Sequence, residues 1–406
     1  MAYLNRYYWF LWVAQAVSSV GDSIASLFMG WTVYNITGSQ VAMGNLYIAF
    51  VIPEIVVRIL GSPLVDRVDR RYLMFCMDFV RFVAFATLTS IVLLGKLQLW
   101  HLYAIAIIGG ASAALFYPSG IAVLSSIVHS KEMVRANSIL QSSLQGAQLL
   151  GAALAGVLLS FAGAASGFGI NALTFAISAL CIILLPRSVG VPSQIVSHHN
   201  TDRAYLAELV EGISFYKTHR SLLILLLIVS VANLTSAAIA PTIIPYGVEH
   251  VKTNAMGLGI LQSSFSAGYL AGIVLGIFKG NFSQQRKPMM FSLFLWGVFQ
   301  IALGLFPSLP VAVALRAGTG LATAVFNAFA IALLVSAIPK HLQGRALSFA
   351  LVVVQAAEPL GAFFGTVIVE QYGILSLLIG GGLGIAIISL ASLPLLRSLD
   401  EYRSTT

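Results

Sequence analysis

Charged residues are scarce in this sequence. Asp, Glu, Lys and Arg together make up 9% of its 406 residues, whereas 58% of the residues are hydrophobic. A soluble domain carries about 25% charged residues, so the shortage excludes a water-soluble globular protein and a disordered one. The mean hydropathy of +0.92 indicates that little of the chain lies outside a bilayer. We therefore expect an all-α membrane protein that crosses the bilayer many times.

Cysteine is almost absent as well. Cys76 and Cys181 both lie in apolar stretches, which excludes a disulfide framework. The sequence also lacks a metal-ligand cluster, a phosphate-binding loop and a nucleophile motif, so we expect no enzyme activity, no cofactor and no metal. The net charge of +8 would suit a nucleic-acid partner. Its distribution along the chain favours a topological origin instead, so we expect no nucleic acid.

Apolar runs between polar or Gly- and Pro-marked breaks predict twelve membrane-spanning helices. A span needs about 20 apolar residues, and the length leaves room for about twelve with short connections. The predicted helices are 7–36, 43–64, 72–94, 100–128, 137–162, 166–186, 221–248, 256–280, 289–306, 309–338, 346–370 and 373–396.

Lys and Arg residues divide unequally between the two sides of this predicted topology. With both termini in the cytoplasm, 17 of the 22 fall at cytoplasmic ends. Only Lys96 and Lys252 fall outside, and Arg58, Arg81 and Arg316 lie within spans. Cytoplasmic loops of membrane proteins carry an excess of Lys and Arg. The pattern therefore predicts a multi-pass protein of a plasma membrane with both termini in the cytoplasm.

The chain contains an internal repeat. Residues 110–152 align with 320–362 without a gap and give 15 identities in 43 positions, including Arg135/Arg345 and Gly151/Gly361. Six helices return the chain to the same side, so the repeat is parallel. The predicted organisation is an N-terminal half, a cytoplasmic linker with an amphipathic helix, and a C-terminal half, at residues 1–186, 187–220 and 221–406. Parallel six-helix halves are typical of rocker-type secondary transporters.

The connection between the second and third predicted helices carries a recognisable motif. Its sequence, Gly61-Ser-Pro-Leu-Val-Asp66-Arg67-Val-Asp69-Arg70-Arg71, resembles the loop signature of the major facilitator superfamily, Gly-x-x-x-Asp-Arg-x-Gly-Arg-Arg. It departs from that signature at its first glycine, displaced to Gly61, and at its second, replaced by Asp69.

The Asp-Arg-x-Asp-Arg-Arg form of this motif is similar to the drug:proton antiporter branch that contains macrolide-efflux proteins and the enterobactin exporter. The resemblance implies the major facilitator fold, with 12 transmembrane helices in two parallel six-helix halves related by pseudo-two-fold symmetry. It also implies residence in the inner membrane of a bacterium. These implications agree with the predicted spans and the internal repeat.

Three acidic residues lie well inside the predicted spans. A charged side chain at mid-bilayer costs about 2.5–3.5 kcal/mol on insertion scales, so each needs a partner, water or a function. Asp22 has no basic residue one turn away, Glu54 precedes Arg58 by four residues, and Glu358 precedes Pro359. We consider Asp22, Glu54 and Glu358 candidates for proton coupling, with helix packing and an intrahelical Glu54–Arg58 ion pair as alternatives.

Further polar residues recur at corresponding places in both halves. Gln141, Gln145 and Gln148 share one helix face, and Gln355 and Glu358 repeat this stripe in the second half. Such stripes suit a water-filled substrate cavity, or polar contacts between helices. The cavity candidates are Arg58, Gln141, Gln145, Gln148, Arg316, Asn327 and Gln355. The candidates for a cytoplasmic gating loop are Asp66, Arg67, Asp69, Arg70, Arg71, Asp78 and Arg81.

Together these patterns predict a secondary active transporter. We expect it to export amphipathic, drug- or macrolide-like molecules by alternating access in exchange for protons, and to act as a monomer in contact with membrane lipid. The alternative is an exporter of a siderophore-like metabolite, or a lipid or lysolipid transporter, without proton coupling.

Overall fold

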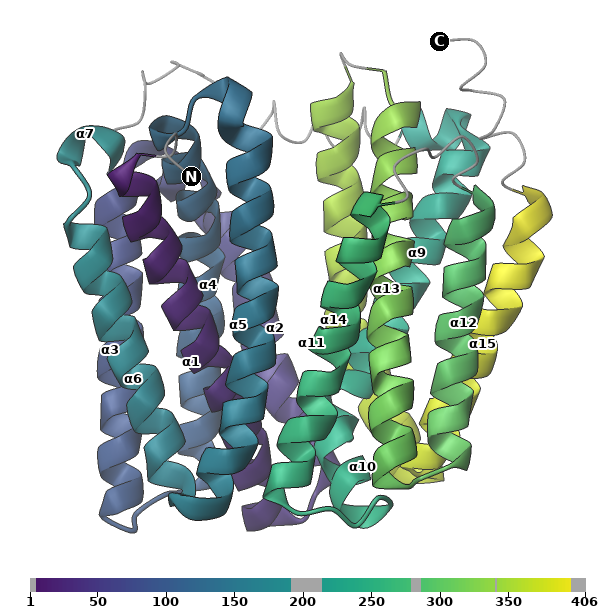
Figure 1. Ribbon diagram of the computed structural model, residues 1–406, viewed down its shortest axis with the longest axis horizontal. Coiled ribbons are helices and arrows are strands. Elements are labelled where there is room, and N and C mark those ends of the chain that lie inside the picture. Colours follow the sequence, from purple (N-terminus) through teal and green to yellow (C-terminus); the bar gives the residue numbers. More distant parts are fainter. Residues whose placement is uncertain (1–4, 191–213, 279–285, 340–341, 396–406) are drawn as a thin grey trace. The chain divides into compact units, whose positions relative to one another are not determined.

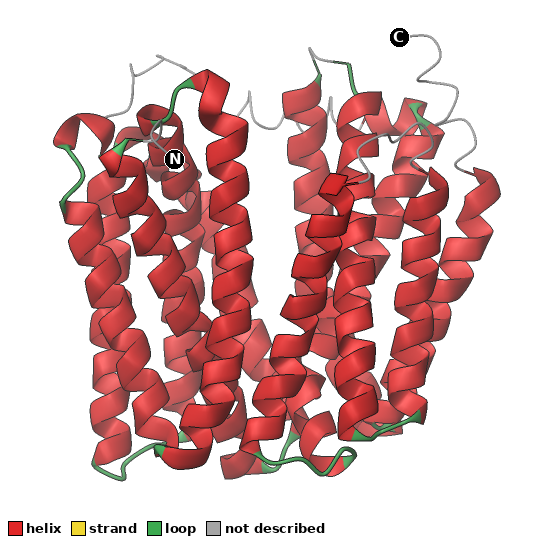
Figure 2. Ribbon diagram, viewed as in Figure 1, coloured by secondary structure: helices red, strands yellow, loops and turns green. Residues whose placement is uncertain are grey.

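The computed structural model describes a helical chain. In the described ranges, helices are joined by short loops and no strand occurs (Figure 2). The predicted amphipathic helix of the linker lies largely outside the described residues, which are 5–190, 214–278, 286–339 and 342–395.

The helices of the first half match the predicted spans to within a few residues (Figure 1). Asn5, Ser39 and Asp69 begin the first three helices as N-caps, because their side chains accept hydrogen bonds from backbone N–H groups of the first turn. The helices are α1 (Arg6–Thr37), α2 (Gln40–Arg67), α3 (Arg70–Leu93), α4 (Leu99–Ile127), α5 (Met133–Phe161), α6 (Gly163–Ile183) and the short α7 (Arg187–Gly190).

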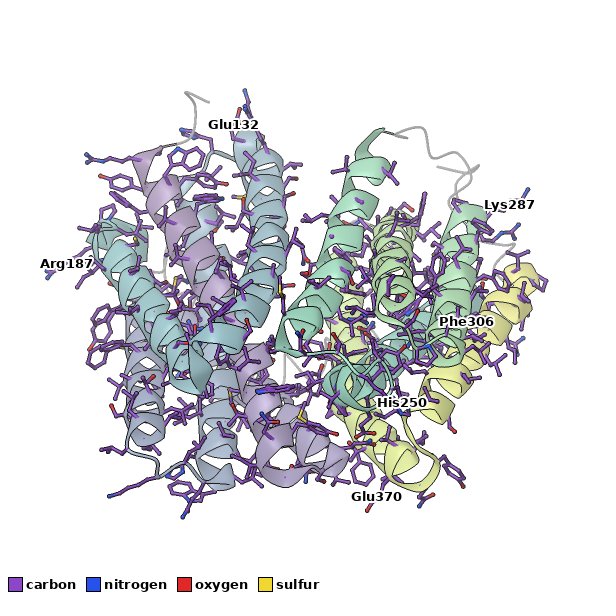
Figure 3. All side chains as sticks on the ribbon, turned by 60° about the horizontal axis from the view of Figure 1, so that its bottom comes forward. Glu132, Arg187, His250, Lys287, Phe306 and Glu370 are labelled. Atoms are coloured by element: carbon purple, nitrogen blue, oxygen red, sulfur yellow. The ribbon has the colours of Figure 1, made fainter. Side chains whose placement is uncertain are left out.

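The second half repeats this series of long helices. Its first span is interrupted: α9 (Arg220–Ile239) continues through the 3₁₀ turn η2 (Ala240–Thr242) into α10 (Ile243–Glu249). The remaining helices are α11 (Ala255–Phe278), α12 (Arg286–Leu305), α13 (Leu309–Ala337), α14 (Gln343–Tyr372) and α15 (Ile374–Leu395). Lys287 and Glu370 lie at opposite ends of this helix set (Figure 3).

Eleven of the described helical segments are long and apolar enough to cross a membrane. The remaining long helix is α1, which has 32 residues and ample length for a span. Its central part carries Gln15, Ser18, Ser19 and Asp22, which lower its hydropathy. Among the long helices of the first half, α1, which carries Asp22, is thus the one without a sufficiently apolar central stretch.

The chain forms two compact units that follow the two halves with one exception. Unit 1 contains residues 1–195 and 243–266, and unit 2 contains residues 196–242 and 267–406. Helix pairs recur between the units: α1 packs with α5 and α6 as α9 does with α14 and α15, and α3 packs with α4 and α6 as α12 does with α13 and α15. The internal repeat of the sequence is thus also a repeat of packing.

Two tyrosines make equivalent hydrogen bonds in the two units. The buried Tyr8 hydroxyl donates to the backbone carbonyl of Ala136 at 3.0 Å, and the buried Tyr216 hydroxyl donates to that of Ala346 at 3.3 Å. Ala136 and Ala346 are counterparts in the repeat. Burial raises the pKa of Tyr216, which precedes the first span of the second half, to about 12, so it remains a donor.

The repeated glycines Gly151 and Gly361 allow close helix contacts. A Cβ atom at Gly151 would lie 2.6 Å from the carbonyl oxygen of Val20 on α1, and one at Gly361 would collide with the carbonyl of Leu234 on α9. Real Cβ atoms do not approach so closely, so both positions require glycine. Each unit therefore brings its first and fifth spans together through the same residue.

Residues 243–266 come from the second half of the sequence but pack in unit 1. Ile244 and Leu258 belong to the same buried cluster as Phe28 and Phe168. A Cβ atom built on Gly259 of α11 would lie 2.6 Å from the Cα atom of Gly156 on α5, so these two backbones are in contact. Unit 1 is therefore completed by a segment that follows the linker.

Candidate functional site

An ion pair joins α1 and α3 in unit 1. Oδ2 of Asp22 lies 3.9 Å from Nη1 of Arg81. The Asp22 side chain is 52% exposed, whereas that of Arg81 is buried. The spacing along α1 gave no sign of this partner because the arginine belongs to another helix. Asp22 is thus an accessible acid beside a buried cation.

Arg81 also pairs with a second acid, Asp78, one turn earlier on α3. Asp78 is completely buried. Its other carboxylate oxygen, Oδ2, accepts a hydrogen bond from Oγ of Ser178 on α6 at 2.6 Å. The sequence grouped Asp78 and Arg81 with the loop charges, whereas the structure places them with Asp22 and Ser178.

Two aromatic rings enclose the Arg81 guanidinium. Its Cζ atom lies 4.6 Å from the ring centroid of Phe116 on α4 and 4.3 Å from that of Phe175 on α6. Both distances suit cation–π attraction, which is stronger in a desolvated setting. The position of the Arg81 guanidinium is therefore fixed by groups from α3, α4 and α6.

Asn171 of α6 completes the surroundings of Asp22. It is fully buried and interacts with the Asp22 carboxylate. Its Nδ2 atom has no partner within hydrogen-bond distance among the described residues. Its Oδ1 atom accepts a hydrogen bond from Oγ1 of Thr174 at 3.1 Å. A buried N–H group without a partner is uncommon in folded proteins, so Asn171 offers a donor beside Asp22.

A second charged pair lies on α2. Glu54 and Arg58 form the intrahelical ion pair that their spacing predicted, and both side chains are partly exposed. Tyr117 of α4 interacts electrostatically with Asp22, Glu54, Arg58 and Arg81. The charged residues of α1, α2 and α3 therefore share one region of unit 1, which we call the polar cluster: Asp22, Glu54, Arg58, Asp78, Arg81, Tyr117, Asn171 and Ser178.

The loop signature makes local contacts within unit 1. The Asp69 side chain accepts hydrogen bonds from the backbone N–H groups of Arg71 and Tyr72 at the start of α3. Arg71 donates to the carbonyls of Ile182 and Ile183 at the end of α6, and Arg70 donates to that of Val65. Arg67 is exposed, and the side chain of Asp66 lies outside the described part.

The remaining candidates differ in burial. On α5, Gln141 and Gln148 are exposed and Gln145 is half-buried. In unit 2, Arg316 of α13 is buried, whereas three candidates are half-buried: Asn327, Gln355 and Glu358. The stripe on α5 thus lies beside, and not within, the buried face of that helix, which includes Leu140, Leu144 and Gly151.

Sequence reasoning missed a contact at the end of α1. Glu249 of α10 accepts a hydrogen bond from the Tyr34 hydroxyl at 2.7 Å and bonds from Nε2 of Gln40 at 2.9 and 3.0 Å. We call these three residues the Glu249 latch. Glu249 is the last residue of α10 and lies at the end of an apolar span. This position was the only feature of the sequence that could have indicated the contact.

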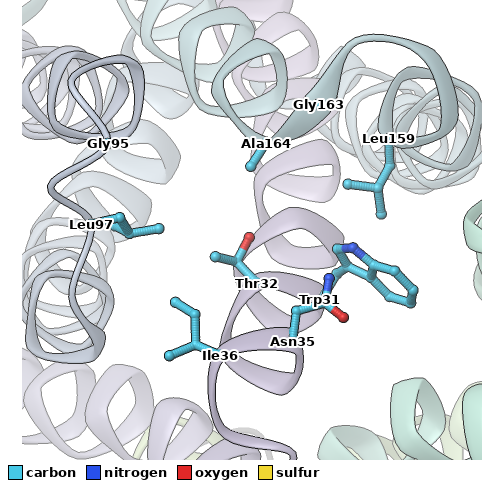
Figure 4. A pocket seen from close by; sticks show the side chains of 9 residues that line it. All are labelled: Trp31, Thr32, Asn35, Ile36, Gly95, Leu97, Leu159, Gly163 and Ala164. Carbon is cyan, nitrogen blue, oxygen red and sulfur yellow. The ribbon is translucent and has the colours of Figure 1, made fainter.

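A pocket of about 420 Å³ opens near the same end of α1 (Figure 4). This volume is at the lower end of the range for small-molecule sites. Its lining carries no charged residue, and Oγ1 of Thr32 has no hydrogen-bond partner in the described ranges. The lining residues are Trp31, Thr32, Asn35, Ile36, Gly95, Leu97, Leu159, Gly163 and Ala164.

Comparison with known families agrees with this arrangement. A model of major facilitator transporters described as "Transmembrane secretion effector" matches residues 3–404. The chain belongs to the major facilitator superfamily. The members of this family are transporters and not enzymes.

Relatives within the superfamily include named efflux proteins. The chain is 23% identical over 367 residues to macrolide efflux protein A of Streptococcus pyogenes, which covers 90% of this chain and 89% of the relative. It is 21% identical over 397 residues to the multidrug efflux pump Tap of Mycolicibacterium fortuitum, which covers 95% of each.

Solved structures share the fold. A POT family transporter in complex with 5-aminolevulinic acid superposes with a TM-score of 0.78 at 13% identity and covers 97% of this chain and 96% of its own. A bacterial homologue of the lysosomal transporter Spinster, in an inward-facing conformation, gives a TM-score of 0.71 at 12% identity, with coverage of 98% and 95%. The twelve-helix major facilitator fold is therefore confirmed.

Proposed function

We propose that this protein exports amphipathic, drug- or macrolide-like molecules by alternating access and couples export to proton entry through Asp22. The observation that supports coupling best is the contrast between a half-exposed carboxylate and the buried guanidinium beside it. The Asp22 side chain is half-exposed in the described chain, and neutralising it changes the charge of the polar cluster by one unit. The substrate class follows from the relatives named for macrolide and multidrug efflux.

The proposed direction of coupling is proton entry in exchange for substrate export. With both termini in the cytoplasm, the proton enters from outside as substrate leaves. One proton that crosses the membrane contributes about 2.3 kcal/mol per 100 mV, which is equivalent to about a 50-fold substrate gradient. In this proposal the protein acts as a monomer in contact with membrane lipid.

The Glu249 latch supports alternating access. It joins a segment of the second half to α1 and α2 of the first half through three exposed hydrogen bonds. Hydrogen bonds to a charged group contribute about 1.5–3 kcal/mol each, and because these are exposed, water can replace them as they break and form during a transport cycle. In this proposal the loop charges Asp66, Arg67 and Arg71 act at the opposite, cytoplasmic end, and the polar cluster lies between.

Transport in proteoliposomes tests the proposal, with erythromycin as the probe. We expect an imposed proton gradient to drive erythromycin against its gradient, and an uncoupler to stop it. Asp22→Asn should abolish uphill transport while counterflow of labelled against unlabelled erythromycin continues, because exchange needs no net proton movement. Ser389→Ala, a substitution in unit 2, is the matched control. Uphill transport unchanged in Asp22→Asn would refute coupling through this residue.

A further inference from the structure

Arg81 lies between two acids that differ in exposure. Asp78 is completely buried and is held by both Arg81 and Ser178. Asp22 is 52% exposed and reaches Arg81 only at 3.9 Å. One acid is therefore buried with two close partners, whereas the other is half-exposed and has a longer ion-pair contact.

The corresponding contact in unit 2 involves a backbone carbonyl in place of a charged side chain. In unit 2, Ser389 of α15 crosses to α12 just as Ser178 of α6 crosses to α3, but it donates to the backbone carbonyl of Met290 at 2.6 Å. The neighbouring positions on α12 are Met290 and Leu293, both buried. Buried ion pairs contribute little to stability compared with apolar packing, so a gain in stability alone does not account for the charges in unit 1.

We propose that Asp78 is the permanent counter-ion of Arg81 and thereby allows Asp22 to gain and lose a proton. If Asp22 were the sole anion beside Arg81, its protonation would leave a buried cation without compensation, which is strongly unfavourable. With Asp78 in place, a proton from water adds to the Asp22 carboxylate and the charge of the three residues changes from −1 to 0. Asp78 is a positioning residue in this scheme, which rests on the proposed function.

The other groups around Asp22 leave this assignment intact. Glu54 and Arg58 of α2 neutralise each other. Asn171 and Ser178 of α6 do not titrate, and Tyr117 of α4 is neutral at physiological pH. On the α5 side, Ser23 donates to the backbone carbonyl of Gln148. Arg81 is thus the cation shared by Asp22 and Asp78 within the polar cluster.

Infrared titration of the protein in lipid tests the proposal without any substrate. The C=O stretch of protonated carboxyl groups is followed against pH, and Asp22→Asn identifies the component that belongs to Asp22. In Asp78→Asn, Arg81 has Asp22 as its remaining acid, so Asp22 should stay ionised to a pH lower by about one unit or more. Asp78→Glu, which keeps the charge, should restore the wild-type titration.

A second pair of variants, each of which removes only one hydrogen bond, keeps the proposal testable if Asp78→Asn does not fold. Ser178→Ala removes one hydrogen bond from Asp78 and should shift the Asp22 titration in the same direction by a smaller amount. Ser389→Ala removes the corresponding bond in unit 2 and should leave the titration unchanged. An Asp22 titration unaffected by both Asp78→Asn and Ser178→Ala overturns the assignment.

The titration experiment tests the role of Asp78 separately from the proposed function. If Asp22→Asn abolishes uphill erythromycin transport while Asp78→Asn leaves the Asp22 titration unchanged, coupling stands and the role of Asp78 is refuted. If the wild-type protein moves no erythromycin yet the Asp22 titration shifts as expected, the role of Asp78 stands and the proposed substrate class fails.

Discussion

Ser178 and Ser389 belong to corresponding helices of the two units, but they bind different acceptors. Ser178 donates to the carboxylate of Asp78, and Ser389 donates to the backbone carbonyl of Met290. Both contacts join a sixth span to a third span. The connection between helices is common to both units, whereas the acceptor is a carboxylate in unit 1 and a backbone carbonyl in unit 2.

Replacing the charges of α3 by the residues of α12 should have the largest effect. Arg81→Leu alone leaves the Asp78 carboxylate buried and unpaired, and we expect the free energy of unfolding to fall by about 3–5 kcal/mol. The double variant Asp78→Met/Arg81→Leu should recover to within about 1 kcal/mol of wild type, because buried ion pairs are often replaced by apolar groups without loss.

Unfolding by SDS from mild detergent micelles measures these differences, and uphill erythromycin transport measures function. Both variants should lose transport. A double variant as unstable as Arg81→Leu would show that the ion pair is part of the fold, and the distinction between the two units would then disappear. Leu293→Ala on α12 is the control for loss of packing at the corresponding site.

Features that depend on one helix were easier to predict from the sequence than contacts between helices. Apolar runs predicted α13 at 309–338, and the structure places it at Leu309–Ala337, because length and hydropathy determine a span locally. The Glu54–Arg58 pair was also predictable, since its members are one turn apart on a single helix. The Asp22–Arg81 contact was not predictable in this way, because it depends on how α1 and α3 pack.

The same reasoning explains why the Glu249 latch was missed. Glu249 lies more than 200 positions from Tyr34 and Gln40 in the sequence. Tyr34 is near the end of the first predicted span, and Gln40 is in the break that follows it. Hydrophobic periodicity assigns residues 243–266 to the second half, which is correct for chain order. It contains no information about the unit in which the segment packs.

Substituting the repeated glycines Gly151 and Gly361 should lower the free energy of unfolding by equal, intermediate amounts. Gly151→Val and Gly361→Val each force α1 or α9 away from its neighbour, and overpacking of this kind typically costs about 1–3 kcal/mol. SDS unfolding of the two single variants should give values that agree with each other. Gly384→Val provides the control, because no atom lies within 4 Å of a Cβ built there. A cost in one unit alone would contradict the equivalence of the two contacts.

The repeated tyrosines should show the smallest effect. Tyr8→Phe and Tyr216→Phe each remove one buried hydrogen bond, and each should lower the free energy of unfolding by about 0.5–1.5 kcal/mol. Burial raises the pKa of Tyr216 from 10.0 to about 12 in the folded state. The protonated Tyr216 hydroxyl therefore contributes its full share of the free energy of unfolding below pH 10, and this contribution decreases as the pH rises towards 12.

SDS unfolding at neutral and alkaline pH checks this prediction. Tyr216→Phe should reduce the alkaline loss of stability relative to wild type, because the titrating hydroxyl is absent. A much larger effect of one tyrosine than of the other at neutral pH would show that the two hydrogen bonds are not equivalent.

The segment at residues 243–266 has a consequence for synthesis of the chain. The long helices that the first half contributes to unit 1 end at Ile183, but the unit includes residues up to Ser266, which the ribosome reaches 83 residues later. At about 5–20 residues per second, this interval lasts about 4–17 s. Throughout it, the site that Ile244 and Leu258 will fill stays uncovered. The first half of the protein is thus made early but finished late, and a ribosome that stalls before residue 266 leaves an incomplete unit in the membrane.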